Sequence, residues 1–317
     1  MGCHLVRRLH AAGRPVSVLD VAPLPSELAR AGVRAMPGSI TDAGCVAAAV
    51  AGAEAVVHLA ALVRDFGRLR DFERLNVEGT RIVVTAARDA GVRRFVLMSS
   101  VAVYDYRMGF RDGDERQPAG GHEFAYGRTK LRAELAVRSL ERPGFETVIV
   151  RPGLFPYGPG DRAASVPMLR AIERGVPLLV GGGRAVLSTS YVGSLVDGVV
   201  RCLDRPEAAG ETFHLADDGC PTWRELVAGM ASALGVRPPR GSVPRWLAGP
   251  AASALEAGWR GLRLGGAPPL TRYRVRTVTS DLHFSNHKAK RLLGWTPEVT
   301  LAEGLAATVA WYRAGAP

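Results

Sequence analysis

Residues Tyr126-Gly127-Arg128-Thr129-Lys130 place a phenol and an ammonium four positions apart, inside a segment (122–141) whose pattern predicts a helix. Positions i and i+4 share one helical face, so the two groups are expected side by side. An ammonium beside a phenol favours the phenolate and lowers a tyrosine pKa that is otherwise about 10. The pair therefore predicts a general acid/base suited to hydride transfer to or from a carbonyl.

The choice of basic residue supports this interpretation. The chain has 41 basic residues, of which only Lys130, Lys288 and Lys290 are lysines. A lysine at 130, in a sequence that otherwise uses arginine, indicates that a compact ammonium is needed there. A Tyr and a Lys at this spacing also occur by chance in helices, so the neighbouring motifs decide how much weight the pair carries.

Length and composition set the class of protein. The chain has 317 residues and is 47% hydrophobic, enough for a large core. Its cysteines stand far apart without a CxxC pair, which predicts reduced thiols, no metal site and a cytoplasmic protein. These cysteines are Cys3, Cys45, Cys202 and Cys220. The first thirteen residues have the pattern of an amphipathic helix rather than a secretory signal, and no apolar run is long enough to span a membrane.

The formal net charge of +11 does not predict a nucleic-acid partner. Arginines alternate with acidic and apolar residues, as in 68–74, and no run of five like charges occurs. Short apolar runs alternate with helical patterns, which predicts an α/β protein with a parallel sheet covered on both faces. The expected strands are 16–20, 34–36, 55–59, 94–99 and 147–151, and the expected helices include 2–12, 70–90 and 122–141.

Five motifs in order carry a family resemblance. They are His58-Leu-Ala-Ala61, Asn76-Val-Glu-Gly-Thr80, Ser99-Ser100-Val-Ala-Val-Tyr104, Tyr126/Lys130 and Arg151-Pro-Gly153. Together they resemble the extended short-chain dehydrogenases/reductases of the NAD-dependent epimerase/dehydratase family. Segments 189–197, 223–226, 268–275 and 284–295 are similar to the branch of 3β-hydroxysteroid dehydrogenases and sterol-4-carboxylate 3-dehydrogenases.

The resemblance implies a Rossmann fold, a doubly wound parallel sheet with a smaller C-terminal substrate region. Residues 1–150 and about 186–205 would form the NAD-binding domain, and 151–185 and 206–317 the substrate-binding region. Ser100 would orient the substrate, with Ser99 as the alternative by one position. Tyr126 would transfer the proton, and Lys130 would lower the pKa of Tyr126 and hold the nicotinamide ribose.

The implied cofactor is NAD, with NADP less favoured because Asp20 ends a strand where a carboxylate accepts ribose hydroxyls and repels a 2′-phosphate. Alternatives stay open for three residues: Asp20 as a surface turn residue, Asn76 as a helix-capping or core residue, and His58 as a packed core histidine, which is the favoured interpretation of His58. The implied cofactor-binding set is Gly2, Asp20, His58, Ala60, Asn76, Tyr126, Lys130, Pro152 and Gly153.

The glycine turn of such folds is represented only by its end. Gly2-Cys3-His4 matches the last part of a GxxGxxG motif, whose backbone amides meet the cofactor pyrophosphate. We expect a further strand and two glycines ahead of Gly2. The alternative is a shortened protein in which the strands at 16–20 and 55–59 close up and dinucleotide binding is impaired.

Departures from the family pattern narrow the chemistry. Val101-Ala102 stand where 4,6-dehydratases have Asp-Glu, and Leu154 stands where sugar-nucleotide enzymes have a diphosphate-binding Asn. Gly38-Ser39 replaces a Gly-Asp pair that contacts adenine, and Asp42 lies too far along to substitute for it. The prediction is an oxidoreductase that interconverts a secondary alcohol and a ketone on an apolar, sterol-like or β-hydroxy/β-keto acid substrate. Alternatives are a sugar-nucleotide epimerase and a non-catalytic Rossmann binding protein.

Segment 245–264 has an amphipathic pattern. On a helical wheel its apolar arc is Leu247, Ala251, Leu255, Trp259 and Leu262, opposite Arg245, Glu256, Arg260 and Arg263. Three roles are open: packing on the protein's own core, a lid over an apolar substrate, and peripheral contact with a membrane surface. A homodimer is a further possible assembly.

Overall fold

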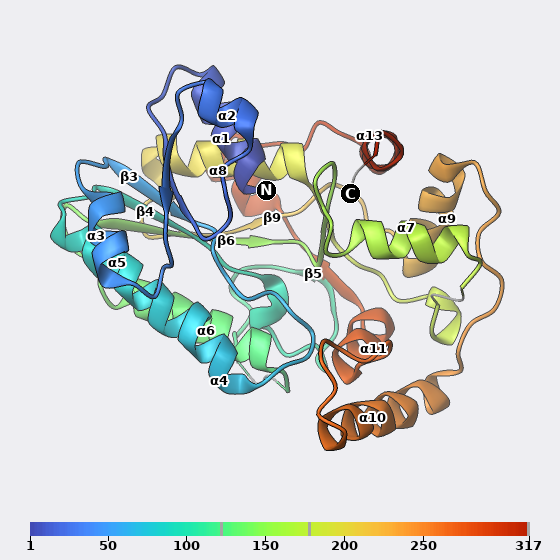
Figure 1. The fold of residues 1–317 in the computed structure, drawn as a ribbon. Helices are drawn as coiled ribbons and strands as arrows, with labels where there is room; N and C mark the ends of the chain where they lie inside the picture. Colours follow the sequence, from blue (N-terminus) through green and yellow to red (C-terminus); the bar gives the residue numbers. More distant parts are fainter. Residues whose placement is uncertain (121–122, 177–178, 316–317) are drawn as a thin grey trace.

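A four-stranded parallel sheet forms the centre of the computed structural model, which describes residues 1–120, 123–176 and 179–315 (Figure 1). Its strand order is β3-β4-β6-β9, with β3 at Ala55–His58, β4 at Arg94–Met98, β6 at Glu146–Pro152 and β9 at Thr212–Leu215. Every residue of β4 is buried, because helices cover both faces and strands flank both edges. Continuous apolar runs are typical of such parallel strands.

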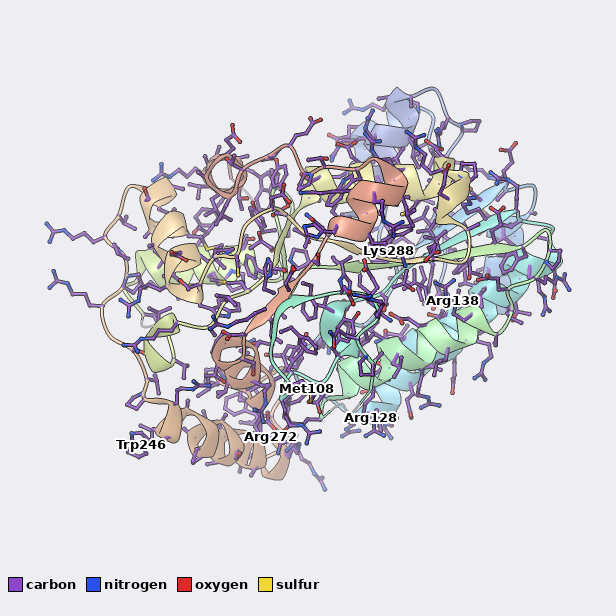
Figure 2. All side chains as sticks on the ribbon, turned by 180° about the vertical axis from the view of Figure 1, so that it is seen from behind. Met108, Arg128, Arg138, Trp246, Arg272 and Lys288 are labelled. Atoms are coloured by element: carbon purple, nitrogen blue, oxygen red, sulfur yellow. The ribbon has the colours of Figure 1, made fainter. Side chains whose placement is uncertain are left out.

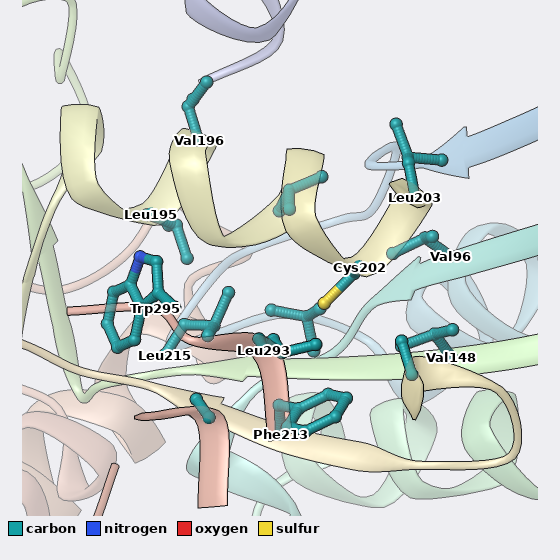
Figure 3. Packing of buried hydrophobic residues seen from close by; sticks show 14 of the residues in the cluster. Val96, Val148, Leu195, Val196, Cys202, Leu203, Phe213, Leu215, Leu293 and Trp295 are labelled. Atoms are coloured by element: carbon teal, nitrogen blue, oxygen red, sulfur yellow. The ribbon is translucent and has the colours of Figure 1, made fainter. Parts of the chain in front are cut away.

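Helices pack on both faces of this sheet, as predicted for a doubly wound α/β fold. On one face Phe95 and Leu97 of β4 pack against α3 (Ala43–Val50), α5 (Thr80–Asp89) and α6 (Ala125–Arg138). On the other face Val96 and Met98 pack against α1 (Gly2–Ala11), α8 (Val192–Asp204) and α12 (His287–Leu293). Figure 3 shows this second layer, in which Leu195 and Cys202 of α8 lie over the sheet beside Leu293 and Trp295.

The sheet is interrupted at one place. β1 (Ser17–Asp20) and β2 (Arg34–Pro37) pair with each other in a separate two-stranded parallel sheet, and α2 (Ser26–Arg30) joins them. In the described chain β1 pairs only with β2, and β3 only with β4. The strands at 16–20 and 55–59 have therefore not closed up, contrary to the alternative considered from sequence.

A second core lies at the C-terminal side. It joins α7 (Ser165–Glu173), α9 (Trp223–Leu234) and α13 (Leu301–Arg313) with the paired strands β7 (Phe155–Tyr157) and β8 (Thr189–Tyr191). Capping boxes at Thr222/Glu225 and Thr300/Glu303 fix the starts of α9 and α13.

Two elements cross the predicted domain division. β9 pairs with β6, and α12 packs into the core of the main sheet, so both belong with the dinucleotide fold although 206–317 was assigned to the substrate region. The remaining strand pair is β5 (Phe110–Gly113) with β10 (Leu282–Phe284). Two helices, α10 (Arg245–Gly261) and α11 (Arg272–Thr279), precede β10 in the chain. Figure 1 shows these two helices at the lower edge of the molecule.

The helix predicted over 70–90 has three parts. α4 (Leu69–Phe72) leads into a π-helical segment, η1 (Glu73–Gly79), and then into α5. π-Helical turns are rare and often occur at functional sites. The predicted helix start at His122 lies outside the described residues. Short 3₁₀ turns occupy Val101–Val103 (η2), Gly181–Gly183 (η3) and Pro206–Ala208 (η4).

None of the described helices combines the length and apolarity that a bilayer crossing requires. Within the described residues, the acidic, histidine and cysteine side chains form no group of three that could hold a metal ion. The four cysteines are free thiols.

Candidate active site

Ser100 and Tyr126 meet at the carboxyl end of β4. Ser100 follows this strand directly, and its Oγ caps the turn Val101–Val103 by accepting from the Ala102 amide at 3.1 Å. The same hydroxyl is close enough to the phenol of Tyr126, in the first turn of α6, to act against the rise in the phenol's pKa. Ser99 is buried, and its Oγ has no hydrogen-bond partner in the described part of the chain. Of the two serines, Ser100 is therefore the one beside the phenol.

Lys130 is buried one helical turn further along α6, and its Nζ donates to the carbonyl oxygen of Met98 at 2.6 Å. Burial lowers the pKa of Lys130 to about 8, although the nearby Glu134 carboxylate opposes the shift. The predicted lowering of the Tyr126 pKa by Lys130 is wrong for this structure. Burial raises the pKa of Tyr126, against a smaller opposite effect of the Ser100 hydroxyl. The Lys130 ammonium is directed at the β4 backbone, where it donates to the Met98 carbonyl.

A buried ionic network that was not predicted from the sequence lies one helical turn beyond Lys130 along α6. Arg151 of β6 donates to both Glu134 carboxylate oxygens, at 2.9 and 2.6 Å, and to the Tyr104 hydroxyl at 2.6 Å. Tyr104 also bonds Nε2 of His214 at 2.8 Å. Glu134 lies four positions after Lys130, so the i, i+4 spacing that singled out Tyr126 and Lys130 was also the available signal for Glu134.

Asn76 fixes the loop after β3 to the active-site helix. Its Oδ1 accepts from the Leu62 amide at 2.7 Å, and its Nδ2 donates to the Leu62 carbonyl at 3.2 Å and to Thr129 Oγ1 at 3.1 Å. Thr129 lies between Tyr126 and Lys130 in sequence. Asn76 thus has the core hydrogen-bonding role that was one of its two interpretations, and it acts from the π-helical segment.

His58 is a packed core residue, the interpretation favoured from sequence. Its Nε2 lies 3.0 Å from Thr80 Oγ1 in a buried contact, and burial together with the Lys130 charge lowers its pKa to about 3. Close packing explains why residue 153 is a glycine. A Cβ on it would lie 2.9 Å from the Thr189 carbonyl, and its amide donates to Ser190 Oγ at 2.8 Å. Pro152 is the buried last residue of β6.

The remaining predicted cofactor residues lie at the same edge of the fold. Gly2 begins α1 within van der Waals reach of Leu59, and Ala60 is exposed in the following loop. Asp20 is exposed at the end of β1, where its Oδ1 accepts from the Ala22 amide at 2.9 Å. Asp42 caps α3 by accepting from the Cys45 amide, a structural role.

This arrangement fits a dinucleotide at its two ends. Lys130 has three N–H donors, of which Met98 accepts one, so donors remain for a ribose. The exposed Asp20 carboxylate can accept the hydroxyls of the other ribose. Between them, α1 starts with no side-chain cap on its first-turn amides, and such amides attract phosphate.

Tyr126 lies in an apolar cluster with aromatic side chains from distant segments of the chain. Tyr273 of α11 packs with Phe124 at 5.1 Å and with Tyr106 at 6.2 Å between ring centroids. Tyr126 and Leu154 join the same apolar cluster. A small pocket opens here, and its lining includes Ala102, Tyr106, Phe124, Gly127 and Tyr273. Sequence analysis missed Tyr106 and Tyr273 as site residues because only the fold brings such distant segments together.

Known proteins share this fold and these motifs. The profile of the NAD dependent epimerase/dehydratase family matches residues 1–216. The 4-hydroxy-2-methyl-3-oxo-4-farnesyl-3,4-dihydroquinoline-1-oxide ketoreductase of Stigmatella aurantiaca is 31% identical over 307 residues, covering 96% of this chain and 91% of that protein. The 3 beta-hydroxysteroid dehydrogenase/Delta 5→4-isomerase of Mycobacterium tuberculosis is 31% identical over 334 residues, covering 98% of this chain and 87% of that protein.

Among solved structures, a short-chain dehydrogenase/reductase superfamily protein from Agrobacterium tumefaciens with bound NAD superposes with a TM-score of 0.76 at 26% identity, covering 99% of this chain and 94% of the other. The chain belongs to the NAD dependent epimerase/dehydratase family, and it is an enzyme of the extended short-chain dehydrogenase/reductase type. The resemblance predicted from the five motifs is confirmed, and relatives named for 3β-hydroxysteroid dehydrogenase activity are among its matches.

Proposed function

We propose that this protein interconverts a secondary alcohol and a ketone on an apolar substrate, with NAD as cofactor. The observation that carries the proposal is the juxtaposition of Ser100 and Tyr126 at the carboxyl end of β4, with Tyr126 in an apolar cluster that includes Tyr106 and Tyr273. A hydroxyl pair of this kind can hold a carbonyl oxygen and exchange a proton with it.

The apolar surroundings favour the substrate class. Leu154 lies where a diphosphate-binding amide would be expected, and it shares an apolar cluster with Tyr126 and Tyr273. Phe124 packs on the Tyr273 ring. The similarity to a ketoreductase of a farnesylated dihydroquinoline oxide and to a hydroxysteroid dehydrogenase supports the same class. A sterol-like compound or an alkyl β-hydroxy/β-keto acid has the required alcohol or ketone on an apolar skeleton.

In the direction of ketone reduction, each residue has a separate role. Ser100 donates a hydrogen bond to the substrate oxygen and orients it, and Tyr126 then delivers its phenolic proton to the same oxygen. Burial raises the pKa of Tyr126, so the phenol keeps its proton at neutral pH and is ready to act as the acid. Lys130 and Asp20 would hold the two riboses. The bound nicotinamide would supply the hydride.

Turnover by the purified full chain tests the proposal. The assay follows NADH consumption with a 3-ketosteroid and with a long-chain β-keto ester, and epimerisation of UDP-glucose in the presence of NAD is measured separately from the sugar product. We expect ketone reduction, and Tyr126→Phe should lower kcat by about 10²-fold or more while NADH binding persists, since the proton donor alone is lost. Ser100→Ala should lower kcat by a smaller factor.

Tyr312→Phe is the matched control, because Tyr312 bonds Glu173 on a helix of the second core and should leave turnover unchanged. Full ketone reduction by Tyr126→Phe would show that another group supplies the proton. Epimerisation of UDP-glucose without ketone reduction would favour the sugar-nucleotide alternative, and absence of dinucleotide binding would favour the non-catalytic one.

A further inference from the structure

We propose that the outer face of α10 and the turn after it form a docking surface for a lipid bilayer with anionic headgroups. We call this surface the α10 face and define it by Trp246, Leu247, Pro250, Ala254, Ala257, Gly261, Leu262 and Leu264. All eight residues are exposed. The proposal concerns binding and does not depend on the reaction proposed above.

The first observation is a concentration of exposed apolar side chains. Trp246 and Leu262 are 77% and 73% exposed, and Leu247 and Leu264 are 44% and 46% exposed. The other large exposed apolar residues in the described part of the chain are far apart in sequence, and all but Leu135 of α6 lie in loops. Single exposed apolar residues are normal on a protein surface, but a contiguous group marks an interaction site. Figure 2 shows Trp246 at the outer end of α10.

The second observation is that the opposite side of α10 packs against the rest of the protein. Ala248, Ala252 and Glu256 are buried, and Glu256 accepts the Arg272 amide at 2.8 Å and pairs with the Arg260 and Arg272 side chains. The inward side of α10 is therefore the side that carries the small alanines, and Ala251, Leu255 and Trp259 beside it are partly buried. The apolar arc predicted from sequence is thus divided: its middle packs inward, whereas Leu247 and Leu262 face solvent.

The outward arc is uncharged. At 100° per residue, the six members of the α10 face within the helix fall inside an arc of about 100°. The 17 residues of α10 make it about 25 Å long. Apolar anchors therefore stand at both ends, with Trp246 and Leu247 at the start and Leu262 and Leu264 after the end. That geometry suits a helix lying flat in the interface, where tryptophan is favoured.

The third observation is charge. Residues 226–280 contain eight arginines and a single acidic residue, the buried Glu256, so most of the formal net charge of +11 lies in this stretch. Arg274 and Arg276 pair with Asp65 and Glu123, but Arg237, Arg240 and Arg263 form no ion pair in the described part of the chain. Arginines around an apolar face attract anionic headgroups, at about 1 kcal/mol each near the surface.

Lipid, rather than a second copy of this chain, is the occupant that this charge favours. Two α10 faces brought together would also bring together two sets of arginines, and like charges oppose that contact. A bilayer with anionic lipid offers an apolar layer for Trp246 and Leu262 and phosphates for the flanking arginines. Aliphatic stems of arginine can lie along the apolar layer while the guanidinium reaches the headgroups.

Vesicle flotation of the full chain tests the docking surface. Vesicles of phosphatidylcholine alone are compared with phosphatidylcholine that contains about a third phosphatidylglycerol, at low and high salt. We expect binding to the anionic vesicles that weakens with salt, and a blue shift of tryptophan emission on binding. Trp246→Ser combined with Leu262→Ser should weaken binding by about tenfold or more, because the buried apolar area is lost.

Matched variants separate the contributions. Met108→Ser removes an equally exposed apolar side chain elsewhere and should leave binding unchanged. Arg240→Gln with Arg263→Gln should weaken binding to anionic vesicles, whereas Arg34→Gln, also exposed, should not. Absence of vesicle binding, or equal binding of the Trp246/Leu262 variant, would overturn the proposal. Self-association that Trp246→Ser abolishes, without vesicle binding, would overturn it in favour of a protein interface.

Discussion

Burial sets the protonation states around Tyr126. It raises the pKa of Tyr126, lowers that of Lys130 to about 8 and lowers those of His58 and His214 to about 3. Each shift has the sign expected when the charged form of the group loses water. At neutral pH the phenol and both histidines are therefore uncharged, and the Lys130 ammonium is the cation held against β4.

The two neutral histidines predict acid sensitivity. Their folded pKa values of about 3 lie below the unfolded value of about 6.5. Below pH 6.5 the unfolded chain binds protons that the folded chain does not, so stability falls with falling pH, by up to about 1.4 kcal/mol per unit for each histidine. Urea unfolding midpoints between pH 7.5 and 5 measure this loss.

His58→Gln should flatten that dependence, whereas His10→Gln, on an exposed helix position, should not change it. A midpoint that is constant over the whole range would contradict neutral burial of His58 and His214.

Asp20 is the residue on which the predicted preference for NAD over NADP depends. Asp20→Ser removes the carboxylate but keeps an oxygen for the Ala22 amide that Asp20 now accepts. Without the negative charge a 2′-phosphate is no longer repelled, so we expect kcat/KM with NADPH to rise relative to NADH by about tenfold or more. Steady-state kinetics with both cofactors measure the ratio. Asp42→Ser is the control, and an unchanged ratio for Asp20→Ser would place Asp20 outside the cofactor site.

At the scale of elements, α6 is held to the sheet by charge as well as by packing. Glu134 of α6 and Arg151 of β6 form an ion pair that is nearly inaccessible to water. Tyr104 and His214 continue the hydrogen-bond network to β9. Because Tyr126 and Lys130 lie on the same helix, this network also positions the two active-site side chains.

Removal of one partner should therefore be costly. Glu134→Gln leaves the Arg151 guanidinium buried without its counter-charge, and we expect the free energy of unfolding to fall by about 3 kcal/mol. Replacing both residues, Glu134→Leu with Arg151→Met, should recover part of this loss. Arg88→Gln breaks the exposed pair with Asp89 and should change stability by less than about 0.5 kcal/mol. Chemical denaturation measures all three, and similar effects for Glu134→Gln and Arg88→Gln would contradict the assignment.

Element identity could be predicted from sequence where the pattern is local. The buried strand at 94–99 and the helix that carries Tyr126 and Lys130 follow from hydrophobic periodicity and agree with the structure within a few residues. The π-helical segment could not be predicted, because one inserted residue hardly changes the apolar pattern of 70–90. Neither could the position of Tyr273 beside Tyr126, since it depends on how α11 packs more than a hundred residues later in the chain.

The orientation of α10 shows another limit. The wheel identified an amphipathic helix, but it placed Glu256 on the solvent side, whereas Glu256 is buried and accepts the Arg272 amide. Small alanines allow close packing of α10 on α11, and a carboxylate can be buried where arginines and an amide satisfy it. Such pairing is a property of the folded chain and cannot be seen in a hydrophobicity pattern.

In the whole molecule, the interruption of the sheet leaves β1 and β3 each with one unpaired edge. β4 has a strand on each side and is buried throughout, but β1 and β3 each have one partner, and their residues other than the buried His58 are exposed or partly exposed. No described strand pairs with the outer edge of β1 or of β3, and unpaired edges of this kind are open to pairing with another segment.

Hydrogen exchange should resolve this difference. Peptides that span 94–98 and 146–152 should retain their amide protons much longer than peptides that span 17–20 and 55–58, because exchange from β1 and β3 needs only local opening. Mass spectrometry of the exchanged full chain measures the protection of each peptide. Equal protection of β1, β3 and β4 would mean that the facing edges are paired.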